Sequence, residues 1–163
     1  MADKKASGAS KTASKTVAMN RKARFEYTIA DEFECGLVLV GTEVKMLRLG
    51  SGVNITDAYA AEKNGELWLL NAQINPYPFG NRHNHEPRRP RKLLLHKRQM
   101  KKLLGSIRQK GHTLVPLSLY FNGRGIAKIK MGLAVGKKQH EKRQTIKERD
   151  WKREQQRLMK GDR

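Results

Sequence analysis

The chain has 163 residues with 37% hydrophobic content, which suits one small domain with extensions. Its 35 Lys and Arg residues outnumber 15 Asp and Glu residues, and the formal net charge of +20 makes nucleic acid the expected partner. Cys35 is the only cysteine and no apolar run approaches the ~18 residues of a membrane span, so the sequence excludes an intrachain disulfide and a membrane partner and favours a reducing compartment, the cytoplasm.

The charge is distributed in zones along the chain. Residues 1–24, 82–112 and 137–163 are strongly basic, whereas residues 25–81 carry more acidic than basic side chains. A uniformly basic coat would suggest nonspecific condensation of nucleic acid. The zoned pattern instead indicates an oriented protein that grips a nucleic acid of defined shape.

Residues 1–19 are rich in Lys, Ser, Ala and Thr and contain no apolar segment, which excludes a secretory signal. An organellar transit peptide is the alternative, but such peptides favour Arg, and none occurs before Arg21. We therefore expect a disordered basic extension over residues 1–19.

The folded domain is expected over residues 20–135, and its first elements are strands. Phe25, Tyr27 and Ile29 alternate with polar residues, which predicts a half-buried strand. Residues 36–40 form a continuous apolar run, which is typical of a strand covered on both faces.

Two short helices are expected. One runs from Gly41 to Leu47 with Thr42 as its N-cap. The other covers residues 99–109, where apolar side chains recur at helical spacing, and Gly111 can end it.

Two hairpins complete the pattern. Residues 59–63 and 67–70 flank Asn64 and Gly65, which favour a type I′ turn, and a second hairpin is expected over residues 117–131. Five or six such strands can bury a small core if the sheet closes. The fold class predicted is therefore mainly β: a small antiparallel barrel of the oligonucleotide-binding (OB) type with short flanking helices.

Evidence for catalysis or metal binding is weak. His83 and His85 with Glu86 lack further ligands at defined spacing and lie in a Pro- and Arg-rich loop, so we expect no metal, no cofactor, and an exposed loop that meets phosphate. Phosphate-loop, nucleophile-elbow and paired-carboxylate motifs are absent from the sequence. A metal-dependent nuclease is the weaker hypothesis, and we expect a protein that is not an enzyme.

Three residues of the domain are candidates for RNA contact. A carboxylate on an RNA-binding face repels phosphate, so Glu34 fits there only if it accepts from a base edge or a 2′-hydroxyl. The alternative is an ordinary solvated acid. Tyr27 and Tyr59 can stack on bases, although core burial is the commoner outcome for tyrosine. Trp68 alternates with Leu67 and Leu69 and is expected to have a structural packing role.

The tail over residues 136–163 is basic and poor in apolar side chains. Its last 27 residues hold eleven Lys and Arg against five Asp and Glu. The sizeable apolar residues are too few for a core-facing stripe, and they are Ile146, Trp151, Leu158 and Met159. We expect the tail to be disordered when free and helical on a polyanion. A merely solubilising tail is the alternative.

Six sequence blocks in order resemble the small protein B (SsrA-binding protein) family of bacterial trans-translation, from about residue 20 to the C-terminus. They are NRKAR at 20–24, EVKMLR at 43–48, NI at 54–55, KLLL at 92–95, LSLY at 117–120 and GKKQH at 136–140.

The resemblance implies an OB-type barrel that binds the tRNA-like domain of transfer-messenger RNA (tmRNA). It implies delivery, with elongation factor Tu, to stalled ribosomes, by a protein that we expect to be monomeric. The RNA-facing positions it implies are Asn20, Tyr27, Glu34, Gly36, Lys45, Arg48, Tyr59 and Leu94. A general single-stranded RNA-binding or ribosomal OB protein is the alternative function.

The resemblance also implies that the tail enters the empty mRNA channel as a helix. His140 is expected to stack on a decoding base of the small-subunit rRNA, where its imidazole offers a π-face and nearby cations hold phosphates. The tail positions implied near the decoding centre or further along the channel are Gly136, Lys137, Lys138, His140, Lys142, Arg143, Ile146, Trp151, Leu158 and Met159.

Overall fold

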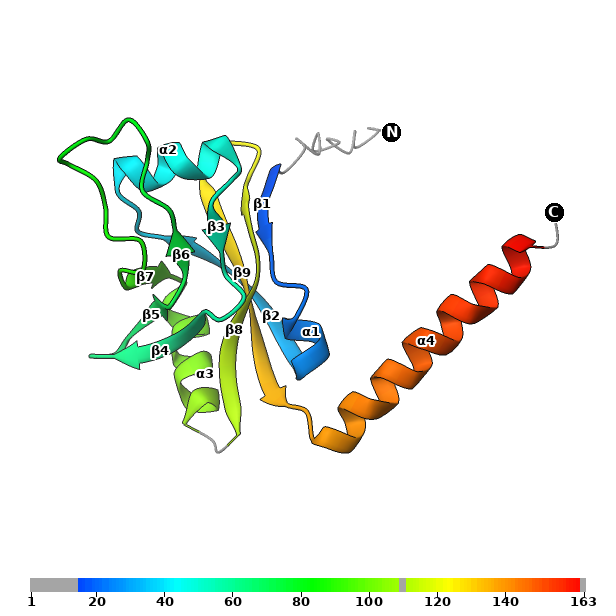
Figure 1. Ribbon diagram of the computed structural model, residues 1–163. Helices are drawn as coiled ribbons and strands as arrows, with labels where there is room; N and C mark the ends of the chain where they lie inside the picture. The colour runs from blue at the N-terminus through cyan, green and yellow to red at the C-terminus, as the bar shows by residue number, and fades with distance from the viewer. Residues whose placement is uncertain (1–14, 109–110, 162–163) are drawn as a thin grey trace, which may run out of the picture.

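The computed structural model describes residues 15–108 and 111–161, and Figure 1 shows a barrel with one long helix leading away from it. In chain order the elements are β1 (Lys15–Met19), α1 (Ala23–Glu26), β2 (Tyr27–Leu37), α2 (Gly41–Leu49), β3 (Val53–Asn54), β4 (Tyr59–Lys63), β5 (Glu66–Leu70), β6 (Gln73–Ile74), β7 (Arg91–Leu94), α3 (Lys97–Ile107), β8 (His112–Phe121), β9 (Ala127–Gly136) and α4 (Gln139–Gly161).

The main sheet closes on itself. Its strand order is β1-β8-β4-β5-β7-β2-β9, and β9 also pairs with β8, so six strands form a ring to which β1 adds along β8. Every pairing is antiparallel. The small antiparallel barrel with short flanking helices predicted from the sequence is confirmed.

Alternation along the strands fills the barrel with aliphatic side chains. The most deeply buried include Leu67 and Leu69 of β5 and Leu114 of β8, with Ile129 and Met131 of β9, each exposed by 2% or less. Their strand neighbours point outward, because successive side chains of a strand face opposite sides. Helix α1 covers part of this outer surface, where Ala23 packs on Val115 and Leu117 of β8, and the rest can face a ligand.

The N-terminal prediction is wrong for its last five residues. Residues 1–14 lie outside the described part of the chain, but Lys15–Met19 form β1, paired with β8 from Lys15 opposite Phe121 to Met19 opposite Ser118. Thr16 and Val17 are β-branched and suit a strand that adds to an available edge.

The first predicted strand also needs correction. Phe25 lies in helix α1, and the strand begins only at Tyr27. At its other end β2 stops at Leu37, and Val38 and Val40 are 45% and 43% exposed rather than covered on both faces. These residues lead into α2, so the apolar run there marks a connection.

Helix α2 begins with a different cap from the predicted one. Val40 is the N-cap residue, and its backbone N–H donates to the Glu43 carboxylate at 2.9 Å, which is half of a capping box. The Thr42 hydroxyl contacts His85 Nδ1 instead. Gly50, at φ +74°, ends the helix in the left-handed region.

The hairpin at Asn64 and Gly65 is confirmed, and so is the second helix, which runs from Lys97 to Ile107 and starts two residues earlier than predicted; Gln109 lies outside the described residues. Asn64 and Gly65 have φ of +54° and +75°, as a type I′ turn requires, and join β4 to β5. Helix α3 begins directly after His96 and buries Leu103 against the barrel core.

Helix α4 projects away from the barrel (Figure 1). Two contacts join this part of the chain to α1: just before the helix the Lys137 N–H donates to the Glu26 carbonyl at 3.0 Å, and in the middle of the helix the Arg149 guanidinium lies 5.5 Å from the Phe25 ring. Disorder of the free tail stays a prediction. None of the helices in the described part of the chain is long and apolar enough to cross a membrane.

Candidate RNA interface

The outer face of β8, β9 and β2 carries a cluster of polar side chains around Glu34. Tyr120 of β8 lies opposite Lys128 of β9, and Lys130 of β9 lies opposite Glu34 of β2. Because Cys35 and Ile129 point into the core, their strand neighbours must point outward. The barrel thus places these four polar residues, distant in sequence, on one surface.

Glu34 is held in place from two sides. The Tyr120 hydroxyl donates a hydrogen bond to Glu34 Oε2, and the Lys128 ammonium lies 3.3 Å from Glu34 Oε1. The Tyr120 bond, followed by the Lys128 bond and charge, lowers the pKa of Glu34. Burial and the bond to Glu34 raise the pKa of Tyr120 to about 12. Glu34 is therefore an ionised, oriented acceptor.

This geometry suits recognition of hydroxyl or amino groups. An ionised carboxylate with two oxygens has about four acceptor positions, so two protein partners leave lone pairs for a ligand. Lys128 offsets the charge of Glu34, which reduces its repulsion of phosphate. The site can accept from a 2′-hydroxyl or a base amino group.

A second basic surface adjoins this cluster. Arg24 and Lys130 both lie near Glu32, at 2.9 and 3.5 Å. A groove of about 420 Å³ runs beside them between the end of β1 and strands β8 and β9, lined by Met19, Asn20, Arg21, Arg24, Leu117, Ser118 and Lys130. Three cations in one groove fit an RNA backbone.

Asn20 has a structural position at this groove. It is only 5% exposed, its amide donates to the carbonyls of Ile55 (3.3 Å) and Thr56 (3.2 Å), and its Oδ1 accepts from the Ala23 N–H at 2.9 Å. The side chain therefore joins the start of α1 to the segment before β4. Its effect on RNA binding would come through the shape of that connection.

Gly36 and Leu94 form a contact between β2 and β7. They are register partners, and a Cβ at position 36 would lie 3.2 Å from Leu94 Cβ. Leu94 is 49% exposed. The absence of a side chain at Gly36 lets Leu94 present its apolar surface next to Glu34.

The two tyrosines differ in burial. Tyr59 is 44% exposed at the start of β4, so core burial is wrong for this residue. Tyr27 is half-buried and packs on the small cluster of Ala23, Val115 and Leu117. Tyr59 has a ring face available for stacking.

Helix α2 presents two further cations. Lys45 and Arg48 are exposed, and the Lys45 ammonium lies 5.5 Å from the Tyr77 ring centroid. The Arg48 carbonyl accepts from the Lys15 side chain at 3.3 Å, which joins α2 to β1. Because both side chains are exposed, the Lys45 ammonium and the Arg48 guanidinium can reach a ligand.

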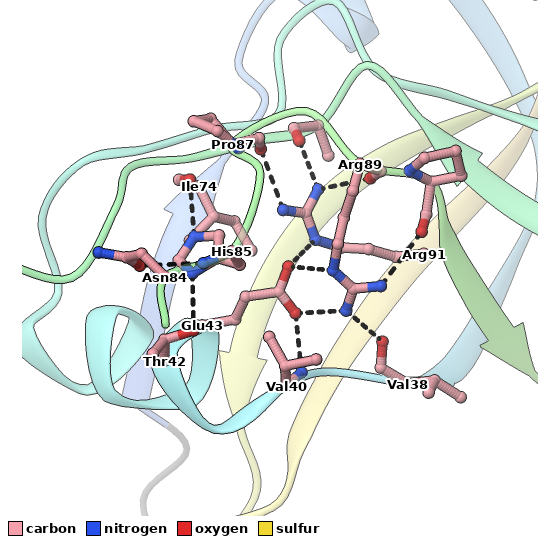
Figure 2. Close-up of polar contacts among 12 residues, drawn as sticks. Val38, Val40, Thr42, Glu43, Ile74, Asn84, His85, Pro87, Arg89 and Arg91 are labelled. Carbon is pink, nitrogen blue, oxygen red and sulfur yellow. Dashed lines mark hydrogen bonds and ion pairs between the residues drawn. The ribbon is translucent and has the colours of Figure 1, made fainter. Parts of the chain in front are cut away.

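A buried ion cluster holds α2 against the barrel (Figure 2). Arg89 donates to both Glu43 oxygens, at 2.8 and 2.6 Å, and Arg91 donates to Glu43 Oε1 at 2.8 Å. Burial alone would raise the pKa of Glu43, but the bonds from Arg89 and the Val40 N–H and the charge of Arg91 lower it. Glu43 is thus an ionised structural residue.

The expectation of an exposed phosphate-binding loop is wrong for one of its residues, His85. His85 is 8% exposed, and its ring nitrogens contact the Thr42 hydroxyl at 2.9 Å and the Ile74 carbonyl at 3.0 Å (Figure 2). Arg91 is fully buried, whereas His83 is exposed. In the described residues no group of three His, Cys, Asp or Glu side chains could hold a metal.

Beyond Gly136 and Lys137, the tail positions lie outside the barrel sheet. Gly136 ends β9 opposite Tyr27, and the remaining positions follow it into α4. The side chains of His140 and Lys142 lie outside the described part. The four apolar residues of the tail are 44–78% exposed, namely Ile146, Trp151, Leu158 and Met159.

The sequence did not identify the partners of Glu34. The alternation of Lys128 and Lys130 with the apolar Ile129 was a usable signal for an outward basic pair on a strand. Tyr120 belonged to a recognised block but had no assigned role, because 86 residues separate it from Glu34.

Comparison with known proteins identifies the family. A family model described as SmpB protein matches residues 17–161. The chain belongs to the SmpB family. An SsrA-binding protein of Sphingomonas elodea is 60% identical over 146 residues, covering 90% of this chain and 91% of the relative. One of Caulobacter vibrioides is 57% identical over 150 residues, covering 92% of this chain and 98% of the relative.

A solved structure agrees with this assignment to the SmpB family. Its description is "tmRNA-SmpB: a journey to the center of the bacterial ribosome", and one chain in it is 52% identical to this chain with a TM-score of 0.63. The match covers 75% of this chain and 85% of that chain. The closed barrel described above is therefore the SmpB fold.

Proposed function

We propose that this chain is an RNA-binding adaptor that binds tmRNA through its barrel and delivers it to the ribosome. Membership of the SmpB family, whose relatives are SsrA-binding proteins, supports the identity of the RNA. The observation that carries the proposal is the oriented Glu34 carboxylate on a surface flanked by cations.

The binding surface is proposed to extend over the outer face of the barrel. Glu34 accepts hydrogen bonds from RNA, Leu94 adds apolar contact, and Tyr59 stacks on a base. Lys45 and Arg48 hold phosphates from the side of α2. The separation of these groups over several elements suits a folded RNA better than a flexible single strand.

The tail is proposed to act on the ribosome. Its cations, including Lys137, Lys138 and Arg143, would follow the rRNA that lines an empty mRNA channel, with His140 at the decoding centre. In this proposal the barrel and the tail have separable tasks, and the protein works as a monomer in the cytoplasm. Elongation factor Tu is the proposed partner in delivery, and the chain itself performs no chemical step.

Two variants test this division. Glu34→Ala should weaken binding of the tRNA-like domain of tmRNA, measured by fluorescence anisotropy. A chain ending at Gly136 should bind that RNA nearly normally but fail to support tagging of stalled products in a reconstituted translation system. The two-part proposal is wrong if the truncated chain loses RNA affinity and tags in proportion to the RNA it binds.

Competition separates this function from general RNA binding. A nonspecific OB protein would bind any RNA of equal length with similar affinity and salt dependence. We expect total tRNA and homopolymer RNA to compete poorly with the tRNA-like domain. Equal competition would favour the general single-stranded RNA-binding alternative.

A further inference from the structure

The outer surface of the β4–β5 hairpin carries a groove that the proposed contacts do not use. Its volume is about 490 Å³, and it is lined by Ala61, Glu62, Lys63, Trp68, Leu70 and Pro90. Trp68 is half-buried and faces outward, because Leu67 and Leu69 on either side are in the core. The residue opposite Trp68 on β4 is Ala61, whose methyl group is too small to cover an indole.

The groove lies between two positions proposed to contact RNA. Trp68 pairs with Lys92 across β5 and β7, and Leu94 is two residues further on the same face of β7. On the other side, Leu70 of the groove pairs with Tyr59 of β4. An RNA that contacts both Leu94 and Tyr59 therefore passes over the Trp68 ring.

The charges at the rim favour a nucleic acid ligand. Glu62 is paired with Arg108 at 3.0 Å, and Glu66 is paired with Lys92. In contrast, Lys63 is exposed, and no carboxylate among the described residues lies within ion-pair distance of it. The acidic side chains of the hairpin are thus neutralised, while one ammonium group is available for a phosphate.

We propose that this groove holds one unpaired base of the bound RNA, stacked on the Trp68 indole, with the adjoining phosphate on Lys63. The proposal rests on the proposed RNA-binding function. Every base has a π-face, so stacking on an aromatic side chain adds affinity and tolerates different bases. The site would therefore strengthen binding without specifying a sequence.

Fluorescence gives a direct test in the full-length chain. The sequence has two tryptophans, so Trp151→Phe leaves Trp68 as the only indole. The probe is a transcript of the tRNA-like domain of tmRNA. Stacking should quench Trp68 emission at saturating RNA. This measurement needs no substitution at Trp68, so it does not depend on whether a Trp68 variant folds.

Affinity measurements with matched substitutions complete the test. Trp68→Leu, which keeps apolar volume, should weaken RNA binding between about fivefold and about 100-fold, whereas Trp68→Phe should keep most of the affinity. Ile126→Ala serves as the control, because Ile126 is 52% exposed in the β8–β9 turn and outside the groove.

The outcomes distinguish this site from the wider function. Unchanged affinity of Trp68→Leu together with unquenched Trp68 emission, in a chain that still binds the RNA, overturns the stacking site and leaves the adaptor function intact. A loss confined to a protein partner or to the ribosome also overturns it, because the groove would then hold a different ligand. Failure of the wild-type chain to bind the RNA overturns the proposed function itself.

Discussion

Arg91 donates from Nε to Glu43 Oε1 at 2.8 Å, and neither side chain is exposed. The same guanidinium donates to the carbonyls of Ala72 at 2.6 Å and Pro87 at 3.0 Å. One arginine thereby fixes α2 to the residues on both sides of β6. Since α2 carries Lys45, this buried pair positions part of the proposed RNA surface without touching RNA.

Removal of one member of this pair should be strongly destabilising. Glu43→Ala leaves Arg91 buried without its carboxylate, which should lower the free energy of unfolding by about 3–5 kcal/mol in urea titrations. The double variant Glu43→Leu/Arg91→Met should be more stable than Glu43→Ala, because no unpaired charge remains. Lys22→Ala, which breaks only an exposed pair with Glu26, should change stability by less than about 1 kcal/mol. A cost for Glu43→Ala as small as that of Lys22→Ala would contradict a structural role for the pair.

The same carboxylate predicts how stability depends on pH. The pKa of Glu43 is lower in the folded chain than the ordinary value of ~4.3 in the unfolded chain, so the folded state binds fewer protons. The stabilisation is therefore complete above pH ~4.3 and is lost as the pH falls through the folded pKa. Thermal unfolding of wild type between pH 3 and 6 should show this loss, and Glu43→Gln should show a flatter profile. Parallel profiles would mean that another carboxylate dominates acid unfolding.

Local signals were sufficient for some elements of the fold and insufficient for others. Asn64 and Gly65 specify their turn through their own backbone preferences, so the hairpin is predictable. Phe25 is different, because its alternation with Tyr27 fits a strand, whereas its contact with Arg149 of α4 and the Asn20 bond to Ala23 accompany the short helix α1. Tertiary contacts of this kind leave no local pattern.

The candidate site shows the same division. Glu34 was identifiable from the sequence, because a carboxylate on an RNA-binding face repels phosphate and therefore fits there only if it makes a specific contact. Its Tyr120 bond joins residues 86 positions apart, and the Glu43–Arg91 pair joins residues 48 positions apart. A buried arginine cannot be distinguished from a phosphate-binding one by sequence, since burial depends on a distant carboxylate.

The Tyr120 hydroxyl should control both the ionisation and the orientation of Glu34. Tyr120→Phe removes the largest cause of the lowered Glu34 pKa, so that pKa should rise toward its ordinary value in a carboxyl-carbon NMR titration. The affinity for the tRNA-like domain should fall by roughly fivefold, as expected for one hydrogen bond. Tyr77→Phe keeps the ring near Lys45 and is the matched control. Equal affinities of the two variants would argue against an oriented Glu34 as the acceptor.

Cys35 should be chemically inert in the folded chain. It is 1% exposed, and burial raises its pKa to about 12, so almost no thiolate forms at pH 8. A thiol reagent should therefore react slowly with the native protein and at the rate of a free thiol in denaturant. Rapid reaction of the native chain would indicate that β2 opens frequently, in conflict with its pairing on both sides to β7 and β9.

Gly36→Ala should affect RNA binding more than stability. The new methyl group would lie 3.2 Å from Leu94 Cβ, which is fixed to the backbone, so β7 must shift by a few tenths of an ångström at Leu94. Stability should change by less than about 1 kcal/mol, because loss of glycine freedom in the unfolded chain offsets the contact. The affinity for the tRNA-like domain should fall, because the shift moves the apolar surface of Leu94 away from its position next to Glu34. Gly36→Ala/Leu94→Gly relieves the contact, because it removes Cβ of residue 94, but it also removes the apolar side chain, so it should restore the amide shifts of β7 and leave RNA binding weak. Full affinity in both variants would show that this part of the barrel lies outside the interface.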